Sequence, residues 1–352
     1  MTEGRALVPL AHSVADVRRR LGPRAREQVR GAYRWMVLGR ALDARMQGLQ
    51  RQGRVGFYGA TTGNEAVNVA AGLLSAKEDW IYPGLREQLV ALVRGHPLAT
   101  YAQHLFATSL DPSRGRQMPC HPSAVDVHYV SMSSVIGTQI THAVGTARAM
   151  RQRRAPGVVF AFFGDGATSA NDFHAGLNLA GVDRLPMMFV CVNNQWAISL
   201  PVERQSAVAT LSSKAAAYGF EGATVDGTDY FAVHDALSRS LAESRAGRGP
   251  WLLEFQVYRM TAHSSSDDPS KYQPADWALR ARAHDPVLRL GAWLEEAEWL
   301  SRSEGESLSR AADQEVRRVI DLAEATPPPD PGSLFEGVVA EPLSAPDGFP
   351  DA

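Results

Sequence analysis

The sequence predicts an α/β fold in which a parallel β-sheet is flanked by helices. Two apolar runs of strand length, residues 158–163 and 185–192, enclose a stretch with a helical pattern at 172–180. Runs that are apolar on both faces are typical of parallel strands covered by helices on both sides. Because a strand, a helix and a second strand follow in this order, a right-handed crossover and neighbouring strands are expected.

Further elements are expected on either side of this unit. Residues 24–49 carry apolar side chains at three- and four-residue spacing, which predicts a helix. Residues 64–74 predict a short helix whose Ala and Gly content would allow close packing. Two more strand candidates follow at 223–225 and 251–258.

The last third of the chain changes in composition. Residues 261–274 are polar and predict a loop. Residues 280–325 predict two amphipathic helices, the first carrying Trp293 and Trp299, and a run of three prolines stops the second. The final twenty or so residues are rich in Pro and acidic groups and are expected to lie on a surface or against a partner.

The composition excludes several classes of protein. The 352 residues are 45% hydrophobic and carry a formal net charge of −2, which excludes disorder and binding to nucleic acid through bulk positive charge. Length alone suggests one large domain or two small ones, at about 150 residues per domain. Cys120 and Cys191 are too few for a disulfide framework, so a reducing compartment is the simplest interpretation.

Neither a membrane-spanning segment nor a signal peptide is expected from the sequence. No stretch approaches the ~18–20 uninterrupted apolar residues of a spanning helix, so no membrane partner is expected. Residues 1–20 lack an apolar signal core, and Glu3 and Asp16 weaken a mitochondrial interpretation of this Arg-rich segment. The predicted location is the cytoplasm.

Polar residues end the two central strands. Gly164, Asp165 and Gly166 follow the first strand, and Asn193 and Asn194 end the second. Ligands of open α/β sheets bind at the carboxyl ends of the strands. One carboxylate, one amide oxygen, a backbone carbonyl, a water and two phosphate oxygens would complete the octahedron of Mg²⁺. The glycines allow the backbone to approach phosphate closely.

Each motif alone is weak evidence. A lone GDG is commonly only a turn, and a lone Asn pair is weaker still, whereas the two together after two buried strands are more specific. A nicotinamide site fits less well, because GDGATS lacks the last glycine of GxGxxG. None of the three lysines follows a glycine, so a GxxxxGK[ST] phosphate loop is excluded.

These motifs resemble the thiamine diphosphate signature, within the strings FFGDGATSANDFHAGLN and VNNQWAIS. The fuller pattern resembles the α subunit of the thiamine diphosphate-dependent decarboxylase component of 2-oxo acid dehydrogenase complexes. Further blocks that resemble this family lie at 51–66, 115–119, 133–140, 225–229, 284–290 and 327–335, so the resemblance covers nearly the whole chain. The string HSSSDDPSKY resembles the branched-chain (2-oxoisovalerate) type, and Trp196 and the lack of a transit peptide resemble bacterial members.

The resemblance implies a domain division and a set of cofactor residues. A thiamine diphosphate-binding α/β domain over 51–275 would lie between an N-terminal helical extension, 1–50, and a C-terminal helical tail, 276–352. The family's cofactor-binding positions fall on Arg86, Ser134, Ile136, Gly164, Asp165, Gly166, Ala167, Asn194, Trp196, Ile198 and His263.

Within this set the resemblance implies separate roles. Mg²⁺ would be held by Asp165, Asn194 and the backbone carbonyl of Trp196, and Ile136 would keep the thiamine bent. The family's diphosphate ligands fall on Arg86, Gly166 and Ala167. A monovalent cation, K⁺ in some relatives, would lie at Ser133, Thr138 and Gln139.

The resemblance also implies catalytic and substrate positions. His263 matches the family's active-site histidine, which would orient the oxo acid or shuttle a proton. The substrate positions match Phe57, Leu85 and Ser134, and Leu85 replaces an aromatic residue usual in the family. Ser264 corresponds to a phosphorylation position of mitochondrial relatives, and that regulation is not carried over.

The implied activity is the oxidative decarboxylation of a branched-chain 2-oxo acid, with acyl transfer to a lipoyl group. The cofactor supplies the electron sink. The family takes a required glutamate from a separate β subunit, so the chain is expected to be inactive alone and to work as an α2β2 heterotetramer. A lipoyl acyltransferase is the other expected protein partner.

Two other interpretations within this fold remain open at this point. One is a pyruvate or acetoin dehydrogenase α subunit. The other is a catalytically weak α-like scaffold, which the departures from the family pattern at Leu85, Ala170, Asn171 and Val192 would allow.

Overall fold

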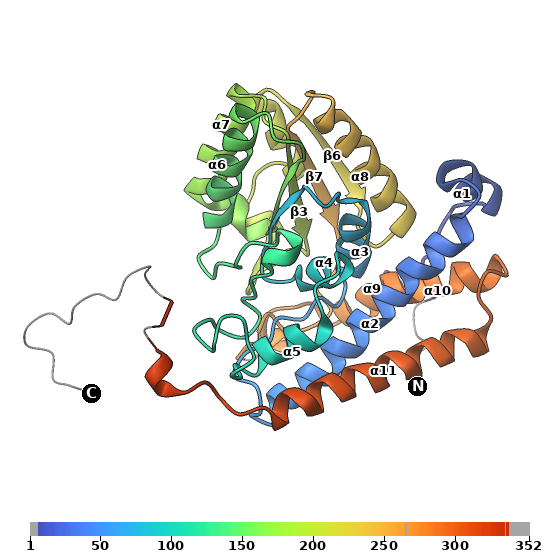
Figure 1. The fold of residues 1–352 in the computed structure, drawn as a ribbon. Coiled ribbons are helices and arrows are strands. Elements are labelled where there is room, and N and C mark those ends of the chain that lie inside the picture. Colours follow the sequence, from blue (N-terminus) through green and yellow to red (C-terminus); the bar gives the residue numbers. More distant parts are fainter. Residues whose placement is uncertain (1–5, 265, 335, 338–352) are drawn as a thin grey trace, which may run out of the picture.

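A five-stranded parallel sheet forms the centre of the molecule (Figure 1), as expected from the sequence. The computed structural model describes residues 6–264, 266–334 and 336–337. The strands are β1 (Trp80–Tyr82), β2 (Val159–Gly164), β3 (Met187–Asn193), β6 (Glu221–Asp226) and β7 (Trp251–Gln256), in the spatial order β1-β2-β3-β7-β6. The two strands predicted to be neighbours, β2 and β3, do pair, with Gly164 opposite Val192.

Helices cover both faces of the sheet, because alternate strand residues point to opposite sides. Phe160 and Phe162 of β2 join one buried cluster, and Val159, Ala161 and Phe163 join another. The helices on the face of the first cluster include α3 (Glu65–Leu74), α4 (Gln88–Val93) and α8 (Tyr230–Arg245), and those on the second are α6 (Thr138–Gln152) and α7 (Asn171–Val182). The continuous apolar character of the strands is thus explained by burial on both faces.

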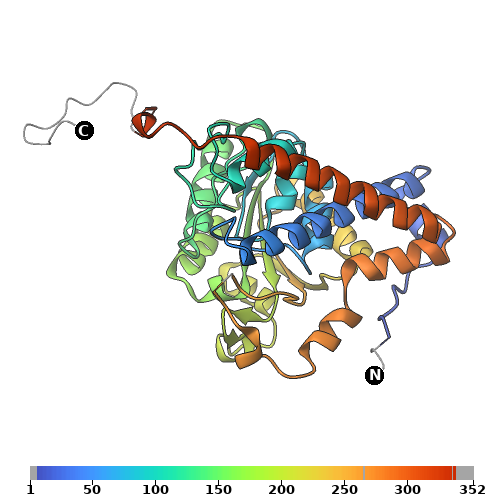
Figure 2. The same ribbon diagram turned by 90° about the horizontal axis from the view of Figure 1, so that it is seen from below.

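Helices from the two ends of the chain pack together over the first cluster. The long helices α2 (Ala25–Arg51) and α11 (Arg302–Ala325) lie side by side, and α5 (Leu98–Leu105) also contacts α11 (Figures 1 and 2). A shorter helix, α1 (Val14–Leu21), precedes α2 and ends at Gly22, which has a positive φ. Buried residues of α2 and α11 belong to the same cluster as those of the sheet.

The C-terminal region contains three helices, so the prediction of two helices over 280–325 was wrong. They are α9 (Trp277–Ala283), α10 (Pro286–Glu296) and α11. Asp285 accepts hydrogen bonds from the first turn of α10 and Ser301 forms a capping box on α11, so each residue begins a new helix. Trp299 lies between α10 and α11 rather than on the same helix as Trp293, and the two rings meet edge to face with centroids 5.1 Å apart.

Several short elements escaped the sequence analysis because they are too short to show a periodic pattern. β1 has three residues, and β4 (Trp196–Ala197) pairs with β5 (Leu200–Pro201) in a small hairpin. The short 3-10 helices are Val125–Val127, Asp165–Ser169, Val202–Arg204, Leu211–Tyr218, Pro269–Lys271 and Pro331–Ser333. One of these interrupts the predicted loop at 261–274.

Among the described residues, no helix is long and apolar enough to cross a membrane. The expectation for the last twenty residues, including the end of the block at 327–335, falls mostly outside the described residues. The domain boundaries at 50 and 275 stay predictions.

Phe189 offers a direct test of the packing at the centre of the sheet. Its side chain is fully buried in β3 and stacks on Phe220. Replacement by Ala (Phe189→Ala) should leave a cavity and lower the free energy of unfolding by about 3–5 kcal/mol, measured by chemical denaturation. Leu322→Ala, at a half-exposed position of α11, is the control and should change it by less than about 0.5 kcal/mol. Equal effects of the two substitutions would contradict this packing.

Candidate active site

The ends of β2 and β3 bring Asp165 and Asn194 together. Asp165 directly follows β2, and Asn194 directly follows β3. The two strands are adjacent, and the backbone N–H of Asn194 lies near enough to the Asp165 carboxylate to act on its pKa. The juxtaposition expected from the sequence is therefore present.

The Asp165 carboxylate has one paired and one unpaired oxygen. The side chain is only 1% exposed. Oδ2 accepts a hydrogen bond of 2.9 Å from Nε2 of Gln205, whereas Oδ1 has no hydrogen-bond partner among the described residues. Burial raises the pKa of Asp165, and the hydrogen bond from Gln205 acts in the opposite direction. A buried unpaired carboxylate oxygen is costly, so this atom is suited to receive a cation.

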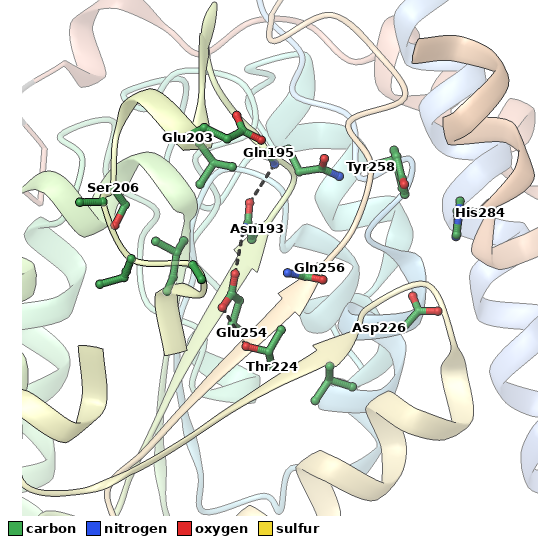
Figure 3. A pocket seen from close by; sticks show the side chains of 16 residues that line it. Asn193, Gln195, Glu203, Ser206, Thr224, Asp226, Glu254, Gln256, Tyr258 and His284 are labelled. Atoms are coloured by element: carbon green, nitrogen blue, oxygen red, sulfur yellow. Dashed lines mark hydrogen bonds between the residues drawn. The ribbon is translucent and has the colours of Figure 1, made fainter. Parts of the chain in front are cut away.

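The two asparagines at the end of β3 have different tasks. Asn193 donates from Nδ2 to Glu254 of β7 at 2.7 Å and accepts from the backbone N–H of Gln195 at 2.9 Å (Figure 3). Glu254 in turn accepts from Thr224 of β6, so the ends of three strands are linked through one buried carboxylate. Asn193 thereby fixes the turn that presents Asn194.

The β4–β5 hairpin lies against the turn that follows β2. A Cβ atom on Gly166 would lie 2.7 Å from Cβ of Ala197, so only glycine fits there without movement. The side-chain oxygen of Asn194 accepts from the backbone N–H of Trp196 at 3.2 Å. Ile198, at the tip of the hairpin, is 55% exposed. The hairpin therefore brings Trp196 to the same strand end as Asn194.

Arg86 joins the start of the polar loop to this edge. Its guanidinium is buried and donates to the backbone oxygen of Ala60 at 2.6 Å and to that of His263 at 2.8 Å. The backbone N–H of His263 donates to Asp267 at 2.7 Å. Both the backbone oxygen and the backbone N–H of His263 are therefore hydrogen-bonded, which fixes the loop that carries it.

The His263 imidazole is neutral at pH 7. Partial burial lowers its pKa to about 4, and the nearby positive charges of Arg86 and Arg259 act in the same direction. A neutral imidazole keeps one ring nitrogen free to accept a proton. The predicted role of His263, to orient the oxo acid or shuttle a proton, stays a prediction.

Arg259 is a site residue that the sequence analysis missed. Its side chain is 2% exposed, and Nη1 donates to the backbone oxygen of Trp196 at 3.4 Å. Its charge also acts on Asp165 and Arg86. The sequence did offer one signal: Arg259 directly follows the apolar run at 251–258, just as the polar residues Asp165 and Asn194 follow the other two apolar runs.

Two of the predicted substrate residues, Phe57 and Ser134, both contact His121. Ser134 is hydrogen-bonded to Nε2 of His121, and the ring of Phe57 lies 6.0 Å from the His121 ring. Leu85 packs beside Gly59, where a Cβ atom would lie 3.0 Å from Cγ of Leu85. His121 was missed because it follows the quoted block at 115–119 and carries no motif of its own.

The segment 133–139 contains both exposed apolar and buried polar side chains. Ile136 is 61% exposed, so it is not part of the hydrophobic core of this chain. Gln139 is buried and donates from Nε2 to the backbone oxygen of Phe162 at 2.9 Å, while its Oε1 has no partner among the described residues. Ser133 hydrogen-bonds to the backbone of Val135, and Thr138 begins α6.

A cavity of about 680 Å³ lies next to Asn193, and Asp165, Arg86 and His263 are not among its lining residues. It opens at the ends of β3, β6 and β7, and Glu203, Gln256 and Tyr258 are among its lining residues (Figure 3). In the described part of the chain, no cluster of three or more His, Cys, Asp or Glu side chains could hold a metal ion. The donor set at the strand ends is instead one carboxylate beside neutral oxygens.

Comparison with known proteins gives consistent results. Residues 33–332 match the family described as "Dehydrogenase E1 component". The chain is 37% identical to the 2-oxoisovalerate dehydrogenase subunit alpha of Bacillus subtilis, over 88% of this chain and 94% of that protein. It is 38% identical to the 3-methyl-2-oxobutanoate dehydrogenase subunit alpha of Mycobacterium tuberculosis, over 90% of this chain and 83% of that protein.

A plant relative is longer than this chain. The 2-oxoisovalerate dehydrogenase subunit alpha 2, mitochondrial, of Arabidopsis thaliana is 36% identical over 89% of this chain. The match spans 66% of the plant protein, which is just under two thirds of its length.

Glu87 gives the site a pH-dependent stability. Its buried carboxylate accepts from the backbone N–H of Arg86 at 3.1 Å, and burial raises its pKa to about 7. The folded state therefore binds more protons than the unfolded state between pH 4.5 and 7, so this group makes stability fall as pH rises through that window. Relative to Glu87→Gln, the wild type should lose roughly 3 kcal/mol between pH 4.5 and pH 8, measured by denaturation at each pH. Parallel pH profiles of the two proteins would contradict the raised pKa.

Proposed function

Because the chain belongs to the dehydrogenase E1 component family, we propose that it is the α subunit of a branched-chain 2-oxo acid dehydrogenase. The proposed reaction is the oxidative decarboxylation of branched-chain 2-oxo acids, of the 3-methyl-2-oxobutanoate type, with acyl transfer to a lipoyl group. The observation that carries the proposal is the buried, unpaired Oδ1 of Asp165 beside Asn194. The relatives compared above are named as 2-oxoisovalerate or 3-methyl-2-oxobutanoate dehydrogenase subunits, so the pyruvate and acetoin alternatives are not favoured.

The residues at the strand ends fit thiamine diphosphate with Mg²⁺. Mg²⁺ prefers oxygen ligands and commonly takes one or two carboxylates together with substrate phosphates. The ion would be held by Oδ1 of Asp165, by Asn194 and by the backbone oxygen of Trp196. Gly166 has no side chain, so the backbone of its turn is open to a diphosphate. When bound, thiamine diphosphate supplies the nucleophilic carbon and the electron sink for decarboxylation.

Positive charge at this edge suits a diphosphate. Arg86 and Arg259 are both buried, and burial lowers the pKa of each guanidinium while nearby carboxylates act in the opposite direction. Arg259 lies 4.0 Å from the Asp267 carboxylate, whereas the guanidinium of Arg86 donates to the backbone oxygens of Ala60 and His263, so the charge of Arg86 stays available to an anion. Arg86, with Gly166 and Ala167, would contact the diphosphate, and Gly164 and Ile198 would lie on the same edge.

His263 would act on the substrate as a base and as an orienting group. Its neutral imidazole can accept a proton or a hydrogen bond at one ring nitrogen, and its peptide is fixed by Arg86 and Asp267. Phe57, Leu85 and Ser134 would line the oxo-acid pocket, with His121 holding Ser134 in place.

A monovalent cation is proposed at Ser133, Thr138 and Gln139. The buried Oε1 of Gln139 has no partner among the described residues, and such an oxygen is a suitable ligand for K⁺. Ile136 of the same loop would contact the thiamine ring.

A β subunit is the proposed partner at this edge of the sheet. Ile136 and Ile198 are large apolar residues that stand exposed near the proposed cofactor site. Exposed apolar side chains that gather at one place are typical of interaction surfaces. An α2β2 heterotetramer in the cytoplasm, together with a lipoyl acyltransferase, is the assembly that we propose; a scaffold without activity is not favoured, because the polar site is intact.

Substrate preference tests the proposed activity. The chain co-expressed with a β subunit should turn over 3-methyl-2-oxobutanoate at least about tenfold faster than pyruvate, expressed as kcat/KM with an artificial electron acceptor. The chain alone should show no turnover, because the family's β subunit supplies an essential carboxylate. Preference for pyruvate, or full activity of the isolated chain, would contradict the proposal.

Two substitutions separate cofactor binding from turnover. Asp165→Ala removes the buried oxygen ligand and should abolish Mg²⁺-dependent binding of thiamine diphosphate, measured by calorimetry on the α2β2 assembly. His263→Ala should keep that binding and lower kcat by about 10²–10⁴-fold. Wild-type binding by Asp165→Ala would disprove the metal assignment, and an unchanged kcat of His263→Ala would remove His263 from the reaction.

A further inference from the structure

Gln205, which does not lie on a strand of the central sheet, contacts the Asp165 carboxylate. It follows the 3-10 helix Val202–Arg204, and its Nε2 donates to Oδ2 of Asp165 at 2.9 Å. The same nitrogen donates to the backbone oxygen of Leu200 in β5 at 3.0 Å. Its Oε1 lies 3.5 Å from the position that a Cβ atom on Gly166 would occupy. One amide group therefore touches the carboxylate, the hairpin and the glycine turn.

This contact determines which oxygen of Asp165 is available. With Oδ2 occupied by the amide, only Oδ1 remains unpaired. A glutamine amide donates a hydrogen bond without carrying a charge, so it orients the carboxylate and leaves its negative charge in place. An arginine or a lysine at this position would neutralise that charge. The second bond, to Leu200, restrains the amide itself. The carboxylate is thus fixed in rotation while its negative charge stays available to a cation.

We propose that Gln205 is a positioning residue that holds Asp165 as a single-oxygen ligand for the divalent cation. The inference rests on the proposed function, because it assumes that a cation binds at Oδ1. The competing explanation is that Gln205 only ties the β4–β5 hairpin to the end of β2. The two differ in what they predict for metal affinity: a positioning role changes the affinity for Mg²⁺, and a purely structural role changes only stability.

The test is an Mg²⁺ titration of thiamine diphosphate binding by the α2β2 assembly. Gln205→Met keeps the length of the side chain but cannot donate, and Gln205→Ala is a second variant in case the first does not fold. The matched control is Glu203→Gln, in the same 3-10 helix, whose exposed side chain has no interaction with Asp165. Melting temperatures without Mg²⁺ are measured for all four proteins.

We expect the half-saturating Mg²⁺ concentration of the Gln205 variants to rise by about 10–100-fold, the range found for second-layer partners of metal ligands. The affinity for thiamine diphosphate at saturating Mg²⁺ should change by less than about threefold, and the control should match the wild type. Mg²⁺ half-saturation within twofold of wild type would overturn the inference, including the case in which only the melting temperature falls. Absence of Mg²⁺-dependent binding in the wild type would instead overturn the proposed function.

Discussion

The structure depends on one buried carboxylate whose charge is only partly compensated by the protein. Transferring an isolated charge from water to a protein interior is costly unless the charge is paired. Asp165 has a neutral amide on one oxygen and nothing from the described residues on the other. The pairing of β2 with β3, the hairpin that follows β3 and the glycine turn at Gly166 together fix the position of this carboxylate.

The electrostatics around Asp165 are arranged for an anion as well as for a cation. Burial and the positive charge of Arg259 lower the pKa of Arg86, and both arginines lower the pKa of His263. Two guanidinium groups held near each other are unfavourable until an anion neutralises them. A metal ion with a bound diphosphate satisfies the carboxylate and the arginines together. Burial, together with the positive charges of Arg86 and Arg259, lowers the pKa of His263 and keeps its imidazole neutral at physiological pH, which is the form that can accept a proton.

Local patterns in the sequence were sufficient for the parts of this site that lie on strands. The apolar runs predicted β2 and β3, and their polar ends predicted Asp165 and Asn194 at one edge of the sheet. Chain reversals set by single capping residues were harder to read, because Asp285 and Ser301 act through backbone hydrogen bonds and do not alter the apolar pattern around them. For this reason α9 and α10 were predicted as one helix, and Trp299 was predicted to lie on the helix of Trp293 rather than after its end.

The residues missed at the site share a different cause. Arg259, His121 and Gln205 reach the site through tertiary contacts. Of the three, Arg259 alone has a local signal, its position directly after the apolar run at 251–258. The burial of Arg259 and the contact of the Gln205 amide with Asp165 are visible only in the fold. Such residues orient the groups that a motif names, so a motif identifies where chemistry can occur and the fold determines how its groups are held.

The most direct test of the account is to locate a divalent cation at the strand ends. Crystals of the α2β2 assembly grown with thiamine diphosphate and Mn²⁺, in place of Mg²⁺, would show the ion by anomalous diffraction. The account predicts one Mn²⁺ bonded to Oδ1 of Asp165, next to the diphosphate, with Oδ2 still hydrogen-bonded to Gln205. Bound thiamine diphosphate with Mn²⁺ at other residues, or with Asp165 turned away from it, would contradict the account.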